Sequence, residues 1–189
     1  MIPIHLRNVP PPIETFNHTE FLSFMAKWIK PESYLELGVR AGGNFYSIAS
    51  HCKVACGVDI NLSQMQCPIL SNMVLVEKTT DEFFTSLDSD TFFDMIFIDA
   101  DHKSESVIKD FINASKFIID DGFIFLHDTY PCNKKMIDPY FLNDCYKAAL
   151  HIKNNFMDDF EMVTLPFNPG LTIIKKMKRN KQIITEDIE

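Results

Sequence analysis

The chain has 189 residues, of which 46% are hydrophobic and 23% charged, and is most simply one domain with a sizeable core. The formal net charge of −8 argues against a nucleic-acid backbone as the main partner, because that kind of binding needs clustered Lys and Arg. No apolar run approaches the roughly 20 residues that span a bilayer, and we expect no secretory signal at the N-terminus.

The first 17 residues carry four prolines, three of them consecutive (Pro10–Pro12), which predicts an extended arm rather than a helix. Apolar residues then recur at helical spacing from Thr19 to Ile29, and Pro31 closes that helix. We therefore divide the chain into an arm over 1–17, a folded domain over 18–176 and a charged tail over 177–189.

Short apolar runs follow, and each is continuous rather than alternating, which suits strands that helices cover on both faces. These five runs lie at 33–37, 54–59, 73–77, 92–99 and 122–128. An Asp-Asp-Gly turn at 120–122 introduces the last of them. Two further runs, 161–165 and 171–174, flank a turn-rich link and predict a terminal hairpin.

Helical patterns separate these runs along the chain. They lie near 43–51, from about Lys103 onward, and over 141–155. The middle helix places one apolar face at Val107, Ile108, Phe111, Ile112 and Ser115. Strands that alternate with helices predict an α/β fold, a single-domain Rossmann-like doubly wound sheet, mostly parallel with a C-terminal antiparallel hairpin.

The first predicted strand leads into a glycine-rich turn and then a helix. Glu36 stands near the strand's carboxyl end, Gly38 permits the turn, and Gly42 opens a helix whose first amides lack partners. A dinucleotide fingerprint would need a second glycine where Arg40 stands, and the Glu36 carboxylate would repel a pyrophosphate. The turn suits a ligand with a cationic group, although many purely structural strand–helix units contain such glycines.

Acidic residues end four of the predicted strands. They are Glu36, Asp59, Asp99 and Asp128. Each of them alone is readily explained as a turn former. Because the carboxyl ends of parallel strands meet at one rim, the four together predict a ligand site there.

Together these features resemble the class I S-adenosylmethionine-dependent methyltransferases, and more narrowly a small group related to sugar O-methyltransferases and cephalosporin-hydroxylase-like proteins. The resemblance covers nearly the whole chain, about residues 19–176. Its motifs are Tyr34–Gly38 with Gly42, Gly57–Asp59, Phe97–His102, Gly122–Thr129, Leu165-Pro166 and Pro169–Leu171.

The resemblance implies that S-adenosylmethionine is the cofactor. Gly38 would let the backbone approach its methionyl part, Glu36 would face its cationic end, and Asp59 would accept both ribose hydroxyls. Thr79 and Thr80 would contact the adenine, although the same residues also read as a helix cap with Glu82. The expected cofactor-binding residues are Glu36, Gly38, Gly42, Asp59, Thr79, Thr80 and Asp101.

The resemblance also implies a catalytic role for Asp99 and a metal site formed by Asp99 and Asp128. In metal-dependent relatives such acids hold a divalent cation, for which Mg²⁺ is the natural candidate. The sequence His127-Asp128-Thr129 departs from the family pattern, so the third ligand and the metal requirement stay open. His102 is the candidate general base, with a helix-capping role for Asp101 and His102 as the alternative.

The predicted function is O-methylation of a small hydroxylated acceptor, of sugar or phenol type. Five cysteines without a C-x-x-C pair predict reduced thiols and a cytoplasmic protein, and a homodimer is left open. The alternatives are a non-catalytic cofactor- or partner-binding module of the same fold and, less favoured, an NAD(P)-dependent oxidoreductase.

Overall fold

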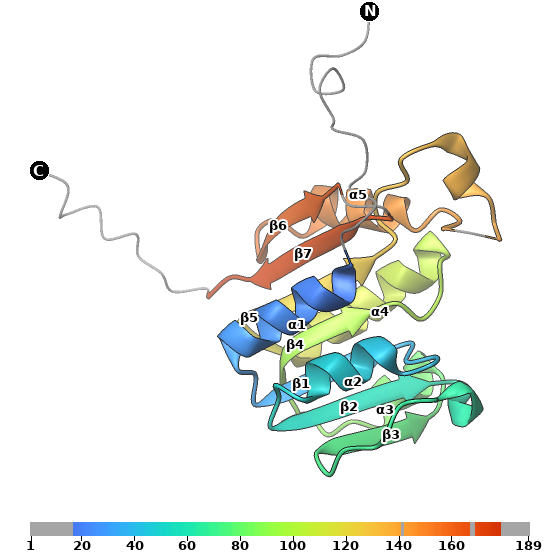
Figure 1. Ribbon diagram of the computed structural model, residues 1–189. Helices are drawn as coiled ribbons and strands as arrows, with labels where there is room; N and C mark the ends of the chain where they lie inside the picture. The colour runs from blue at the N-terminus through green and yellow to red at the C-terminus, as the bar shows by residue number, and fades with distance from the viewer. Residues whose placement is uncertain (1–16, 141, 167–168, 179–189) are drawn as a thin grey trace, which may run out of the picture.

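The predicted apolar runs form the parallel part of a seven-stranded sheet, in the order β3-β2-β1-β4-β5-β7-β6 (Figure 1). The computed structural model describes residues 17–140, 142–166 and 169–178. The parallel strands are β1 (Ser33–Leu37), β2 (Val54–Asp59), β3 (Met73–Glu77), β4 (Phe93–Ile98) and β5 (Ile118–His127). The predicted hairpin, β6 (Phe160–Leu165) and β7 (Leu171–Lys176), adds the antiparallel strands. The predicted fold class is confirmed.

The strand order reverses at β1, which lies between β2 and β4. Connections on the two sides of β1 therefore diverge, and they leave room outside the carboxyl ends of β1, β2 and β4. Ligands of open α/β sheets bind at this kind of position. The fold thus places the acids predicted from the strand ends next to a natural binding crevice.

Helices cover both faces of the sheet, as the continuous apolar runs predict. Helices α1 (His18–Ile29) and α2 (Gly43–Ala49) pack on one face, and Figure 1 shows them on the near side of the sheet. Helices α3 (Thr80–Thr85), α4 (Ser104–Phe117) and α5 (Tyr146–Asn155) pack on the other. Successive residues of β1 alternate between the two cores, with Tyr34 facing α1 and α2, and Leu35 facing α3–α5.

Two predicted boundaries differ from the structure. The Asp-Asp-Gly turn does not precede β5 but lies within it, where Asp121 has φ 62° and the pairing with β4 shifts register. This bulge lets the strand begin four residues earlier, at Ile118. Helix α5 begins at Tyr146 rather than at 141, a residue outside the described ones.

The buried face of α4 is also rotated from the predicted one. Val107 and Phe111 are buried as predicted, but Ile112 is 38% exposed. Asp110 and Ala114 complete the buried stripe in its place. A charged residue therefore occupies a position that the apolar pattern assigned to the surface.

Several predictions concern the ends of the chain and its cysteines. The arm and most of the tail fall on 1–16 and 179–189, outside the described residues. Cys52, Cys56, Cys67 and Cys145 are thiols, as predicted. Within the described ranges, no helix is both long and apolar enough to traverse a bilayer.

Gly38 and Gly43 offer a matched pair for testing the turn after β1. Gly38 has φ 90°, and an added Cβ would strike the Asp99 carbonyl oxygen and lie 2.7 Å from the Cα of Ala100. We expect Gly38→Ala to lower the free energy of unfolding by about 3 kcal/mol or more. A Cβ at Gly43 meets nothing within 4 Å, so Gly43→Ala should stabilise by about 0.5–1 kcal/mol. Urea unfolding measures both, and equal effects would contradict this account.

Candidate functional site

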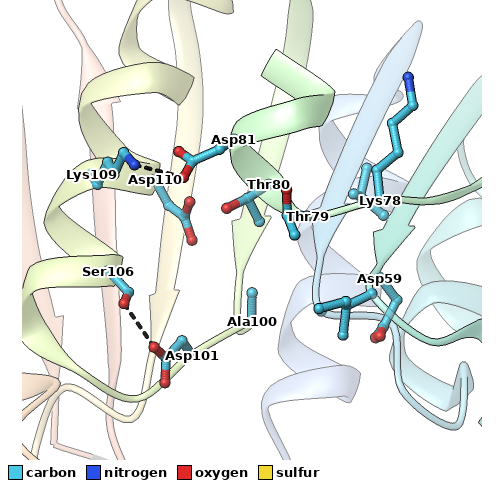
Figure 2. Close-up of a pocket in the computed structure, with 13 residues that line it drawn as sticks. Asp59, Lys78, Thr79, Thr80, Asp81, Ala100, Asp101, Ser106, Lys109 and Asp110 are labelled. Atoms are coloured by element: carbon cyan, nitrogen blue, oxygen red, sulfur yellow. Dashed lines mark hydrogen bonds and ion pairs between the residues drawn. The ribbon is translucent and has the colours of Figure 1, made fainter. Parts of the chain in front are cut away.

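A cleft of about 390 Å³ opens beside the carboxyl ends of β1 and β2 and extends to α4 (Figure 2). It brings together most of the residues predicted to bind the cofactor. These are Gly38, Asp59, Thr79, Thr80 and Asp101. Residues that are distant in the sequence therefore meet at the rim that the strand-end acids predicted.

Asp59 is held in place by two backbone amides. Its Oδ2 accepts a hydrogen bond from Arg40 N at 2.7 Å, and its Oδ1 accepts one from Asn61 N at 2.9 Å. Arg40 has φ 49°, a left-handed conformation that is rare for a non-glycine residue, and this conformation carries its amide to Asp59. Each carboxylate oxygen keeps a second lone pair, so Asp59 can still accept hydrogen bonds from a ligand.

Thr79 forms the helix cap that was the alternative to a binding role. Its Oγ1 accepts a hydrogen bond from Glu82 N at 3.2 Å, while Glu82 Oε2 accepts one from Thr79 N at 3.0 Å. The capping box is therefore confirmed. Because Thr79 and Thr80 also line the cleft, capping and ligand contact are compatible at this position.

Glu36 points away from the cleft, toward the core beneath α1 and α2. It is 1% exposed and lies outside the cleft lining formed by the described residues. Its Oε2 accepts hydrogen bonds from Tyr34 Oη at 2.5 Å and Asn44 Nδ2 at 2.8 Å. Burial nevertheless raises the pKa of Glu36 to about 8, because the lost hydration outweighs these two hydrogen bonds. Glu36 is thus a buried and largely protonated carboxyl at neutral pH.

Gly42 also lies outside the lining contributed by the described residues. It occupies the N-cap position of α2 with φ 82° and packs against the side chain of Met65. Gly38, in contrast, borders the cleft, and its missing side chain makes room for the backbone of Asp99 and Ala100.

A second group of side chains lies next to the cleft, around Asp99 at the end of β4. His102 Nε2 lies 3.1 Å from Asp128 Oδ2 and 3.8 Å from Asp99 Oδ1. His127 Nδ1 lies 3.1 Å from Asp99 Oδ1 and 3.0 Å from Asp128 Oδ1. Asp99, His102 and Asp128, which were predicted as site residues, therefore converge together with His127, which was not, and we call these four residues the Asp/His cluster.

The charges of the Asp/His cluster are strongly coupled. Asp128 is 3% exposed, and burial together with the charge of Asp99 raises the pKa of its carboxyl despite the nearby histidines. Burial alone would lower the pKa of His127, but the hydrogen bond to Asp99 and the surrounding carboxylates raise it overall. Asp128 itself has φ 60°. Its Oδ1 forms no hydrogen bond with the described residues, although His127 Nδ1 lies 3.0 Å away.

A donor atom from each of Asp99, His102 and Asp128 lies within 4.8 Å of the others, close enough for one metal ion. Two carboxylates and an imidazole are suitable ligands for a divalent cation. The unsatisfied Oδ1 of Asp128 is a further reason to regard the set as a fit.

Two residues that were not predicted to belong to the site, His18 and Asp110, lie near these groups. His18 lies at the start of α1, and the centroid of its ring is 4.1 Å from the centroid of the His127 ring. Burial and the charge of His127 lower the pKa of His18 to about 4. Nothing in the sequence near His18 signals this contact, because the packing of α1 on the sheet creates it. Asp110 lines the cleft from α4 and is 3% exposed.

The buried carboxyl of Glu36 predicts a specific pH dependence of stability. Its folded pKa of about 8 exceeds the ordinary glutamate value of 4.5, so the folded protein binds a proton that the unfolded chain releases between these values. The stability should therefore decrease as the pH rises from about 5 to 8. Glu36→Gln, which resembles the protonated acid, should remove part of this decrease in thermal unfolding experiments.

The exposed Glu32→Gln serves as the control and should follow the wild type. Parallel stability curves for wild type and Glu36→Gln across this pH range would contradict a raised pKa at Glu36.

Comparisons with known proteins agree with the geometry. A family model described as a methyltransferase domain matches residues 35–129, about half of the chain. The O-methyltransferase TomG from Streptomyces achromogenes, solved with S-adenosylmethionine, is 15% identical with a TM-score of 0.67, covering 85% of this chain and 80% of that one. A search of curated protein sequences gives no match.

Two further structures show how widely the fold is shared. The O-methyltransferase from Bacillus cereus, in complex with S-adenosylhomocysteine, is 13% identical with a TM-score of 0.65, covering 89% of this chain and 84% of that one. The N-methyltransferase NodS from Bradyrhizobium japonicum is 13% identical with a TM-score of 0.59, covering 85% and 93%. At such identities the likeness establishes the fold rather than the acceptor. The chain belongs to a methyltransferase domain family and has the fold of the class I S-adenosylmethionine-dependent methyltransferases.

Proposed function

We propose that this methyltransferase transfers a methyl group from S-adenosylmethionine to an oxygen atom of a small hydroxylated acceptor, of sugar or phenol type. The observation that carries the proposal is the cleft beside Gly38, in which two backbone amides orient the carboxylate of Asp59. The adjoining Asp/His cluster supplies acids and bases where an acceptor hydroxyl would be activated.

In this proposal the cleft binds the nucleoside part of the cofactor. Asp59 accepts hydrogen bonds from the ribose hydroxyls, and Thr79 and Thr80 border the base. Gly38 and Asp101 line the path toward the Asp/His cluster. Bound S-adenosylmethionine supplies an electrophilic methyl group, so the protein contributes chiefly alignment of the acceptor oxygen.

Glu36 and Gly42 act indirectly in this proposal. Glu36 fixes Asn44 at the start of α2 through its hydrogen bond, and Gly42 begins the same helix. The two residues therefore shape the turn that carries Gly38 and Arg40. We assign them to the support of the cofactor site rather than to contact with the nucleoside.

The charges of the cleft argue against a dinucleotide. Four carboxyl groups line it, those of Asp59, Asp81, Asp101 and Asp110. Two lysines also line the cleft, but Lys109 is paired with Asp81 at 2.6 Å, so Lys78 alone offsets the three other acids. A pyrophosphate would be repelled, which disfavours an NAD(P)-dependent oxidoreductase. The neighbouring Asp/His cluster favours catalysis over a non-catalytic binding module.

A divalent cation would be held by Asp99 and Asp128, with Mg²⁺ as the expected ion and His102 as the third side chain within reach. The cation would make an acceptor hydroxyl more acidic. His102 is otherwise the general base, because its side chain is partly exposed and its Nε2 lies 3.1 Å from Asp128 Oδ2. The two uses exclude one another, since both need the same nitrogen.

The acceptor side and the assembly remain predictions. The segment 130–140, which contains the short helix η3 (Lys134–Ile137), directly follows the Asp/His cluster and is positioned to border an acceptor. On α1, Phe24 is 57% and Trp28 75% exposed, an apolar surface that a homodimer would cover. The cytoplasmic location rests on the thiols alone.

Cofactor binding is tested by isothermal titration with S-adenosylmethionine. We expect Asp59→Asn to weaken binding by about 10- to 100-fold, because a charged hydrogen-bond acceptor of the ribose is lost. Asp88→Asn, an exposed change outside the cleft lining, is the matched control and should bind like wild type. Equal affinity of Asp59→Asn and wild type would exclude this role for Asp59.

The cation is tested with Mn²⁺, whose binding electron paramagnetic resonance detects without turnover. We expect Asp128→Asn to weaken Mn²⁺ binding by about tenfold or more, because a charged ligand is removed while the backbone conformation is tolerated. Mn²⁺ binding that is unaffected by this change would refute a site at Asp128.

The variant His102→Gln separates the two uses of the imidazole. Loss of turnover with normal Mn²⁺ binding identifies His102 as the base. Weakened Mn²⁺ binding identifies it as a ligand. The turnover assay uses Mg²⁺ with a panel of sugars and phenols.

A further inference from the structure

Asp110 is a carboxyl group in the buried stripe of α4 that no step proposed above uses. It lies one helical turn from Val107 and from Ala114, both of which are buried against the sheet. Asp110 is 3% exposed, yet its side chain borders the cleft. A buried carboxyl is costly unless hydrogen-bond donors reach it, so its presence here calls for a function.

The protein only partly compensates for this burial. A hydrogen bond with Thr80 and the charge of Lys109 lower the pKa of Asp110, while Asp81 and Asp101 raise it. Burial is the largest effect, and the pKa rises to about 6. The carboxylate that predominates above this pH has therefore lost hydration that these groups do not fully replace. A donor supplied by a ligand in the cleft would stabilise it.

The position of Asp110 indicates which part of a ligand would supply the donor. Figure 2 shows Asp110 and Asp59 on opposite sides of the cleft, with Thr79, Thr80 and Ala100 between them. A nucleoside whose ribose is bound by Asp59 would extend its base past the two threonines. The far edge of that base would then face α4 and Asp110.

We propose that Asp110 accepts a hydrogen bond from the exocyclic amino group of the base and makes the cleft selective for 6-aminopurine over 6-oxopurine nucleosides. This inference rests on the proposed function, because it takes the nucleoside position from Asp59. A carboxylate attracts an amino group and repels a carbonyl oxygen, so one residue provides both the attraction and the rejection.

The test is a ligand series measured by isothermal titration at pH 8, where the Asp110 carboxyl is ionised. The ligands are S-adenosylhomocysteine, S-inosylhomocysteine, which has an oxygen at position 6, and the purine analogue that has only hydrogen there. Wild type should bind the amino compound at least about tenfold more tightly than either analogue, because a charge-assisted hydrogen bond is lost.

The variant Asp110→Asn replaces an acceptor by a side chain that can also donate. It should reduce the preference for the amino compound and strengthen binding of S-inosylhomocysteine, whose oxygen can accept from the new amide. Glu105→Gln, on the same helix but exposed and outside the cleft lining, should keep the wild-type preference.

The outcomes separate the two proposals. If wild type binds S-adenosylhomocysteine with no preference over the purine analogue, the role of Asp110 is wrong while the proposed function stands. An unchanged preference in a folded Asp110→Asn has the same meaning. If wild type binds none of the three compounds, the proposed function itself fails. Because the wild-type series needs no variant, a misfolded Asp110→Asn would still leave a measurement that can overturn the role of Asp110.

Discussion

The site depends on the close approach of three strand ends at Gly38. Gly38 N donates to Val58 O at 2.8 Å, and Asp99 N donates to Leu37 O at 2.9 Å. These bonds continue the pairing of β1 with β2 and β4 past the end of the sheet. Because Gly38 has no side chain, the backbone of Asp99 can pack against it. The positions of Asp59 and Asp99 relative to one another follow from this contact.

This contact also separates two chemical environments. On one side lies the cleft, where acids and threonines present hydrogen-bond acceptors. On the other lies the Asp/His cluster, whose imidazoles and carboxylates can exchange protons or hold a cation. The segment from Asp99 to Asp101 belongs to both, since Asp99 is part of the cluster and Asp101 lines the cleft. A methyl group would need to travel only a short way between a donor and an acceptor placed on either side.

Sequence could predict the sheet and the rim because both follow from periodic patterns. Continuous apolar runs specify strands that are buried on both faces, and parallel strands carry their terminal acids to one edge. The direction of a single side chain is harder to predict. Glu36 alternates with Leu35 and Leu37, so it points to the opposite side of β1, toward the core beneath α1 and α2. The sequence alone does not show that the cleft lies away from this side.

The buried face of one helix and a contact between distant segments could not be predicted from the sequence. The apolar pattern of α4 fits two adjacent faces, and Ile112 was placed on the wrong one, so Asp110 was overlooked. His18 contacts His127 because α1 docks on the sheet near β5. In the sequence, the four other parallel strands lie between α1 and β5. Patterns within one segment cannot reveal such contacts.

The backbone of Asp128 limits how this protein can evolve. With φ 60°, the position disfavours most residues that carry a Cβ, and Asn and Asp are among those that tolerate it best. Of the residues that fit, glycine provides no ligand atom, and only Asp and Asn provide an oxygen. Natural variation at this position should therefore be confined to a very small set, whatever acceptor a descendant of this chain comes to use.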